Sequence, residues 1–277
     1  MLRQALLSCV ALGALATSAL AADLPTQKGP PPAPVVVAPP FSWTGFYFGL
    51  NAGYADPSSK IGVTPGGAWT GDPDEAGVVA AGTAKFNLDG FIGGAQAGYN
   101  YQIDNIVLGV EADADYLDLS GSYSTPHYGG VVERSSYWAN GSTKIDSLFT
   151  LRGRAGFAAD HWLFFLTGGL ALADENFKQS IGFNNPGEYI GLPLTGGANG
   201  YNAGSASTTA ATWTVGGGVE YALDSHWSFK GEYLYVDLKS LSFNSSYTDT
   251  TPATFTMQHH DSLGGLNIFR VGLNYRM

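Results

Sequence analysis

Residues 44–54 read TGFYFGLNAGY, and the two faces that they would form on an extended strand differ sharply. Successive side chains of a strand point to opposite sides, so alternate residues share a face. One face is large and apolar and the other is small or polar. The first comprises Phe46, Phe48, Leu50, Ala52 and Tyr54, and the second comprises Gly45, Tyr47, Gly49, Asn51 and Gly53. The stretch therefore predicts a β-strand that separates an oily environment from a narrow polar one.

The same two-faced alternation recurs along the chain, and no helix-length stretch with a 3.6-residue period stands out. The predicted strands are 44–54, 91–103, 106–119, 145–159, 162–173, 212–223, 227–238 and 266–277. The short connections are Asp104-Asn105, Asp160-His161 and Asp224-Ser225-His226, and the long polar ones are 56–84, 120–143, 174–209 and 239–262. Short turns at one end and long loops at the other are typical of outer-membrane barrels. We therefore expect an all-β fold, a closed antiparallel transmembrane β-barrel of eight strands with four long extracellular loops and short periplasmic turns.

A soluble β-sandwich would show the same alternation, so the position of the aromatic residues has to decide between the two. Aromatic side chains gather near the short turns, at Tyr99, Tyr101, Phe157, Trp162 and Trp227. Rings of this kind favour the headgroup region of a bilayer. A closed barrel also satisfies every strand-edge hydrogen bond in lipid. The pattern favours the membrane barrel.

The first 21 residues have the features of an export signal, with Arg3, an apolar run and the small-residue site Ala19-Leu20-Ala21. The run is too short for the roughly 20 residues of a membrane helix. Residues 22–42 are Pro-rich and predict an extended periplasmic linker, because proline supplies no N–H to a ladder. The barrel is expected over residues 43–277.

Composition excludes two classes of chemistry. The net charge of −10, with 13 scattered Lys and Arg residues, argues against binding to nucleic acid. Cys9 is the only cysteine. It lies inside the signal with too few residues before it for a lipoprotein site, so the mature chain is expected to have no disulfide and no thiolate chemistry.

Several motifs of the chain resemble those of the porin-like outer-membrane immunogenic-protein family, small OmpA/OmpX-type barrels that include hemin-binding surface antigens. The motifs are WTGFYFGLNAGY at 43–54, GEYLYVDL at 231–238 and RVGLNYR at 270–276, and the resemblance extends over nearly the whole mature chain. The resemblance implies that the C-terminal apolar row is read by the barrel assembly machinery. That row comprises Phe269, Val271, Leu273, Tyr275 and Met277. Members usually end in Phe, so Met277 is a departure.

The inner faces of the predicted strands carry charges of both signs. The residues concerned are Glu111, Asp113, Asp115, Arg152, Arg154, Glu220, Lys230 and Glu232. Pairing of the third and fourth strands is expected to bring Glu111 near Arg154 and Asp113 near Arg152, and a tight turn brings Glu220 near Lys230. In a narrow barrel such charges must pair to offset desolvation. Two interpretations remain open, a structural network or the lining of a path for ions or solutes.

Histidines are the only candidates for a cofactor site. The five are His127, His161, His226, His259 and His260. His259 and His260 suggest heme because of the hemin-binding family members, but neighbouring residues of an extended chain point in opposite directions and no second ligand motif is present. We expect solvated loop histidines, no cofactor and no metal. The sequence also has no cysteine nucleophile, Gly-x-Ser-x-Gly elbow or phosphate loop, so no enzyme is expected.

These features predict an integral outer-membrane protein that contributes to envelope integrity and surface display. The alternatives are a narrow porin-type pore and a hemin-binding surface receptor. The expected partners are outer-membrane lipid and the assembly machinery, and the sequence leaves the oligomeric state open.

Overall fold

The computed structural model describes residues 41–126, 128–129, 136–185, 188–189, 192–193, 198–248 and 254–277. The expected signal, nearly all of the Pro-rich linker and His127 lie outside this part of the chain. Eight long strands build the main sheet. They are β1 (Gly45–Asp56), β4 (Gly90–Ile103), β5 (Ile106–Ser124), β7 (Ser136–Ala159), β8 (Trp162–Asn185), β11 (Ala198–Ala222), β12 (Trp227–Val236) and β15 (Leu266–Arg276).

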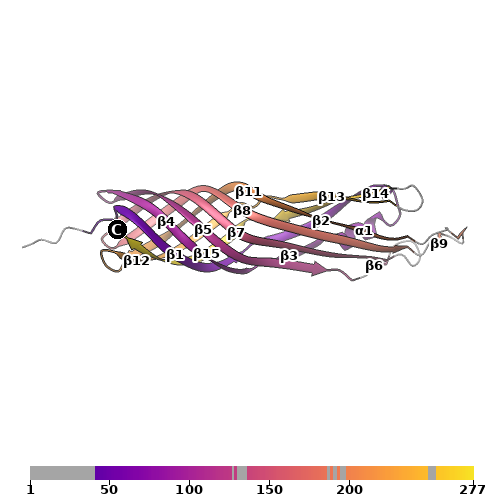
Figure 1. The fold of residues 1–277 in the computed structure, drawn as a ribbon, viewed down its shortest axis with the longest axis horizontal. Coiled ribbons are helices and arrows are strands. Elements are labelled where there is room, and N and C mark those ends of the chain that lie inside the picture. The colour runs from indigo at the N-terminus through magenta and orange to yellow at the C-terminus, as the bar shows by residue number, and fades with distance from the viewer. Residues whose placement is uncertain are drawn as a thin grey trace, which may run out of the picture. The chain divides into compact units, whose positions relative to one another are not determined.

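These eight strands form a closed antiparallel ring (Figure 1). Each pairs with its neighbour in the order β5, β4, β1, β15, β12, β11, β8 and β7, and β5 pairs in turn with β7. The last strand closes the ring onto the first, with Leu50 opposite Leu273. The predicted eight-stranded barrel is confirmed.

The three short connections are tight turns, as predicted. Asp104 and Asp160 each have φ of 51°, the left-handed conformation that two-residue hairpin turns require. In the third turn, Asp224 Oδ1 accepts hydrogen bonds from the main-chain N–H groups of His226 and Trp227, each at 2.7 Å.

Large apolar side chains cover the outside of the ring, and the strand segments that carry them are taken as the membrane-spanning segments. Phe46, Leu50, Leu108, Leu166 and Phe269 are between 49% and 72% exposed. The predicted girdle residues Tyr101, Phe157, Trp162 and Trp227 are also exposed, and Tyr99 is half-buried. Exposure of so many large apolar groups fits lipid rather than water around the ring.

Ile145 departs from the alternation expected for its strand. Strict period two over the predicted strand 145–159 puts Ile145 on the same outer face as Phe149, and this expectation is wrong because the structure buries the Ile145 side chain completely. A register irregularity in β7 between Ile145 and Ser147 shifts the alternation by one residue. A bulge of this kind moves the side chains on one side of it to the opposite face.

The expected long loops are largely β-structure instead. β5, β7, β8 and β11 continue beyond their lipid-facing segments, and a second sheet lies beside them in the order β13, β14, β2 and β3 (Figure 1). Its strands are β2 (Ser58–Gly67), β3 (Ala84–Asn87), β13 (Leu241–Thr248) and β14 (Thr254–Leu263). Helix α1 (Glu75–Gly82) and short strands β6 (Tyr128–Gly129), β9 (Glu188–Tyr189) and β10 (Leu192–Pro193) complete the described elements.

Side chains of these extensions still alternate with a period of two. In the membrane barrel the outer face is apolar and the inner face is polar, whereas in the extensions the inner face carries large apolar residues and the outer face is polar. Phe177 and Ile181 of β8 are fully buried, whereas Lys178 between them is exposed. The outer face is therefore polar, as expected for strands that have left the membrane. Within the described residues, no helix is long and apolar enough to cross a bilayer.

Candidate functional site: the barrel interior

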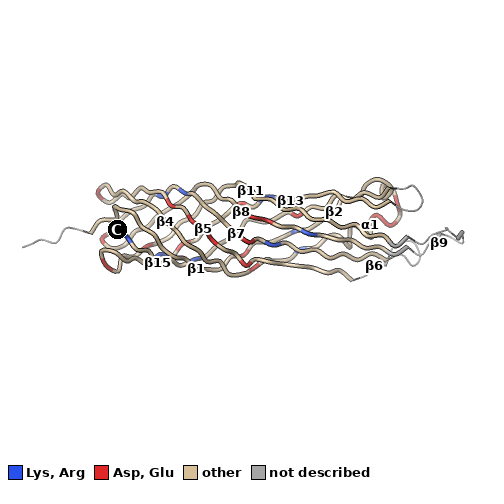
Figure 2. The backbone as a smooth tube through the Cα atoms, in the orientation of Figure 1, with Lys and Arg blue, Asp and Glu red and all other residues tan. Residues whose placement is uncertain are grey.

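Inward-facing side chains of five strands meet in a cluster of charges inside the membrane barrel, here called the ion-pair layer. Its members are Glu111, Asp113, Asp115, Arg152, Arg154, Glu220, Lys230, Glu232 and Arg270. Each is at most 5% exposed. Figure 2 shows acidic and basic positions distributed together along these strands. Along each strand the charged residues occupy alternate positions, so their side chains all point to the inner face. The small or apolar residues between them point outwards.

Arg152 of β7 connects three carboxylates. Its Nη2 lies 2.5 Å from Glu111 Oε1 and 2.7 Å from Asp113 Oδ2, and its Nη1 lies 2.6 Å from Glu232 Oε1. The planar guanidinium suits this role because it presents five donors in a fixed geometry.

Arg270 of β15, on the opposite side of the barrel from Arg152, also bridges three carboxylates. It lies 2.6 Å from Asp113, 2.9 Å from Asp115 and 2.7 Å from Glu232. The sequence analysis did not include Arg270 among the candidates, although the alternation of the last strand places it on the inner face.

The remaining basic groups bind the other end of the layer. Lys230 Nζ lies 3.0 Å from Glu111 Oε2. Arg154 pairs with Glu220, and its guanidinium lies 3.9 Å from the centroid of the Phe165 ring. Tyr47 donates its hydroxyl to Glu111 Oε2 at 2.7 Å. Five acids thus face four bases, and almost every buried charge has an opposite partner, as burial requires.

All eight predicted charged residues belong to the layer, but the expected register is wrong by two residues. Glu111 lies opposite Arg152 rather than Arg154, and Asp113 lies opposite Thr150. Both expected pairs still lie close because the arginine side chains are long: Arg152 reaches Asp113 at 2.7 Å, and Arg154 Nη1 lies 4.0 Å from Glu111 Oε2. Glu220 and Lys230 are directly opposite, as predicted.

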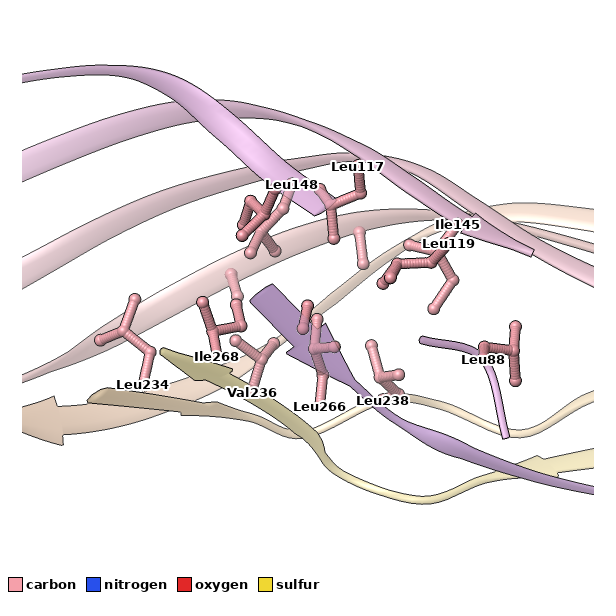
Figure 3. Packing of buried hydrophobic residues seen from close by; sticks show 14 of the residues in the cluster. Leu88, Leu117, Leu119, Ile145, Leu148, Leu234, Val236, Leu238, Leu266 and Ile268 are labelled. Atoms are coloured by element: carbon pink, nitrogen blue, oxygen red, sulfur yellow. The ribbon is translucent and has the colours of Figure 1, made fainter. Parts of the chain in front are cut away.

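A second layer of buried apolar side chains follows the ion-pair layer along the strands, since Leu117 comes after Asp115 on β5 and Leu234 after Glu232 on β12. It is called the apolar layer here, and Figure 3 shows the packing of its apolar side chains. Its larger members include Leu117, Leu119, Ile145, Leu148, Leu234, Val236, Leu266 and Ile268. At the periplasmic end, Trp43 is 1% exposed and packs with Val107, Leu163 and Phe165. The chain therefore fills the barrel at three levels.

Beyond the apolar layer, the extracellular part encloses His259. Its Nδ1 lies 2.8 Å from Gln179 Oε1, its Nε2 lies 2.7 Å from Ser245 Oγ, and its ring stacks on Phe243. Burial, with a smaller effect of His260, lowers the pKa of His259 to about 4. The expectation of a solvated loop histidine is wrong for His259, because the loop is a strand. His260 is half-buried and faces the other way.

The extracellular part also holds a buried carboxyl group, that of Glu175, which has no basic partner among the described residues. Glu175 is 0% exposed, and neither carboxyl oxygen makes a side-chain hydrogen bond. Burial raises the pKa of Glu175 to about 7, an effect opposed by the main-chain N–H of Lys239 and reinforced by Asp261. Asp261 accepts hydrogen bonds from Ser59 at 2.6 Å and Thr143 at 2.5 Å. The described residues contain no cluster of three or more potential metal ligands.

The C-terminal apolar row lies on the outer face of β15. Phe269, Val271, Leu273 and Met277 are 62%, 50%, 43% and 76% exposed, and Tyr275 packs edge-on against Trp227. The row therefore faces lipid in the folded barrel.

Comparison with known proteins finds a family profile and relatives that extend over nearly the whole chain. The profile of the family described as "Outer membrane protein beta-barrel domain" matches residues 7–276. The 31 kDa outer-membrane immunogenic protein of Brucella melitensis biotype 1 is 34% identical over 94% of each chain. The 25 kDa outer-membrane immunogenic protein of the same organism is 26% identical, covering 99% of this chain and 98% of its own. Among solved structures, Neisserial surface protein A matches with 14% identity and a TM-score of 0.35, covering 84% of this chain and 98% of its own.

These relatives are named as outer-membrane proteins and not as enzymes. The family match, the two immunogenic relatives and the closed lipid-facing ring agree on location and architecture. The chain belongs to the outer membrane protein beta-barrel domain family and is an integral β-barrel protein of the outer membrane.

Proposed function

We propose that the barrel is a sealed, non-conducting and non-catalytic anchor that contributes to envelope integrity and holds a folded β-structure at the cell surface. The observation that carries the proposal is the filled interior. Arg152 and Arg270 bridge carboxylates from opposite sides of the barrel, and the apolar layer follows directly. An ion entering this path would have to separate paired charges and then cross an apolar barrier.

A pore formed by the same residues is the competing function. Liposome swelling separates the two, because a conducting barrel equilibrates small sugars across the vesicle wall. We expect liposomes that contain the refolded barrel to shrink in a hyperosmotic sugar solution and to stay shrunken. Recovery of volume at a rate proportional to the amount of barrel would contradict the sealed anchor.

Hemin capture by His259 has no structural support. Both ring nitrogens of His259 already have partners, and the side chain is fully buried.

The outward row of β15 is proposed to have a second role during assembly. Before β1 pairs with it, β15 exposes an apolar face and a free edge, which allows strand addition by the assembly machinery. Deletion of residues 275–277 is then expected to leave the chain in the periplasm, and Met277→Phe is expected to assemble at least as well as the unmodified chain. Normal surface levels of the truncated chain would refute this role.

A further inference from the structure

One exposed aromatic side chain does not fit the lipid-facing surface. Among the described residues, Tyr201 is the large exposed apolar side chain that lies outside the membrane barrel, at 59% exposure. It projects from β11 on the polar outer face of the extracellular extension. Lipid contact therefore cannot explain its exposure.

A second aromatic residue lies in the same cross-strand row. Tyr201 is opposite Gly182 of β8, and Gly182 is opposite Trp138 of β7. A Cβ atom added at Gly182 would lie 2.3 Å from the Trp138 Cε2 atom, so the indole lies against the glycine backbone. The indole therefore covers the backbone of the middle strand next to Tyr201, where that strand contributes no side chain.

An open concavity of about 510 Å³ adjoins Tyr201 on the side towards the membrane, with both polar and apolar lining. Its outward-facing polar groups come from three adjacent strands, β5, β7 and β8. They are Ser122, Ser124, Asn140, Ser142, Lys178 and Ser180. Hydroxyl and amide groups both donate and accept hydrogen bonds, whereas Lys178 only donates.

We propose that this concavity and the exposed ring of Tyr201 bind an oligosaccharide of neutral or weakly anionic pyranose units. A pyranose presents C–H groups on one face, which pack against an aromatic ring, and hydroxyls around its edge, which need both donors and acceptors. Tyr201 supplies the first kind of surface and the concavity supplies the second. Adjacent strands are about 4.8 Å apart, so the site spans roughly 10 Å across β7, β8 and β11, the scale of one or two sugar rings.

The height of the site disfavours a lipid headgroup. Lys178, at the end of the concavity nearer the membrane, lies six residues beyond Leu172, the last exposed apolar residue of β8, which corresponds to roughly 20 Å along the strand. Nucleic acid is disfavoured because Lys178 is the only basic residue that lines the concavity. The small polar side chains also do not form the apolar centre typical of a protein interface.

The test uses the full mature chain refolded in detergent, with maltotetraose, cellotetraose and chitotetraose as probes in saturation-transfer NMR and tryptophan fluorescence titrations. We expect at least one of them to bind, Tyr201→Ala to weaken that binding about tenfold and Lys178→Ala to weaken it less. Tyr201→Phe keeps the ring and should retain most of the binding. Lys144→Ala is the matched control, because Lys144 lies on the same face but is paired with Asp146 outside the concavity.

Three results would overturn the proposal. The first is that none of the three oligosaccharides binds to a barrel that resists SDS before heating. The second is that Tyr201→Ala binds as tightly as the unmodified chain. The third is that the protein binds only to phosphate-bearing lipid vesicles. Conductance plays no part in this test, so the sealed anchor and the sugar site can fail independently.

Discussion

The hydroxyl of Tyr47 on β1 donates a hydrogen bond to Glu111 Oε2 on β5, and its ring crosses the intervening strand β4 at Gly98. A Cβ atom at Gly98 would lie 2.4 Å from that hydroxyl. The glycine is therefore required for the close approach of the ring, and the first and third strands of the barrel are joined through its interior.

Tyr47→Phe removes this hydrogen bond and is expected to lower the free energy of unfolding by about 1–3 kcal/mol, because a buried ionised oxygen loses a donor. Urea unfolding of the refolded barrel measures the change. Tyr101→Phe is the control, because Tyr101 is 54% exposed in the lipid-facing girdle. This substitution should change the free energy of unfolding by less than about 0.5 kcal/mol, the usual range for exposed positions. Equal effects of the two variants would show that the interior bond adds nothing.

Arg152→Ala is expected to lower the free energy of unfolding by roughly 3–5 kcal/mol, because Glu111, Asp113 and Glu232 each lose a buried partner. Arg154→Ala should have a similar effect through Glu220. Lys178→Ala on the outer surface serves as the comparison, with a change near zero. Unchanged urea midpoints for both arginine variants would mean that water reaches the layer.

The strand count, the tight turns and the inward charged faces could be predicted from the sequence because they depend on local alternation alone. The pairing of Glu111 with Arg152 could not, since register depends on how all eight strands tilt and close. The position of Ile145 was missed because a bulge leaves no clear signal in composition. Segments such as 174–185 were expected to be loops because their outer faces are polar, although Phe177 and Ile181 continue the inward apolar period.

Glu175 predicts a pH-dependent stability of the extracellular part. Its folded pKa is about 7 against an ordinary value of 4.5. Between these values the unfolded chain ionises while the folded chain keeps the proton, so the free energy of unfolding falls as pH rises from 4.5 to 7 and then levels off. The total fall is on the order of 2–4 kcal/mol.

Urea midpoints of the parent and of Glu175→Gln between pH 5 and 8 test this. His259 also affects both profiles, because its pKa is lowered from 6.5 to about 4 on folding and the unfolded chain therefore takes up a proton as the pH falls below 6.5. This contribution is the same in both proteins, so the difference between them reports Glu175 alone, and we expect the variant to gain stability relative to the parent as the pH rises from 5 to 8. Parallel pH profiles for parent and variant would show that Glu175 does not titrate in this range.

His259 and His260 form a natural pair of neighbours with opposite environments. His259→Ala leaves Gln179 and Ser245 without their buried partner and should cost about 1–3 kcal/mol, whereas His260→Ala should cost much less. Neither replacement is expected to alter the Soret spectrum of added hemin. A Soret shift in the unmodified protein that is lost in the double replacement would instead support a hemin receptor.

Single-channel recording in a planar bilayer tests the central claim most directly. The refolded barrel, identified by its resistance to SDS before heating, is added to the bilayer at high salt, with a known porin as the positive control for insertion. The sealed interior predicts no discrete current steps from the unmodified protein, even at amounts that give many steps with the porin. Reproducible steps of one size, abolished when the same sample is boiled, would contradict the sealed anchor and assign the ion-pair layer to a conducting path.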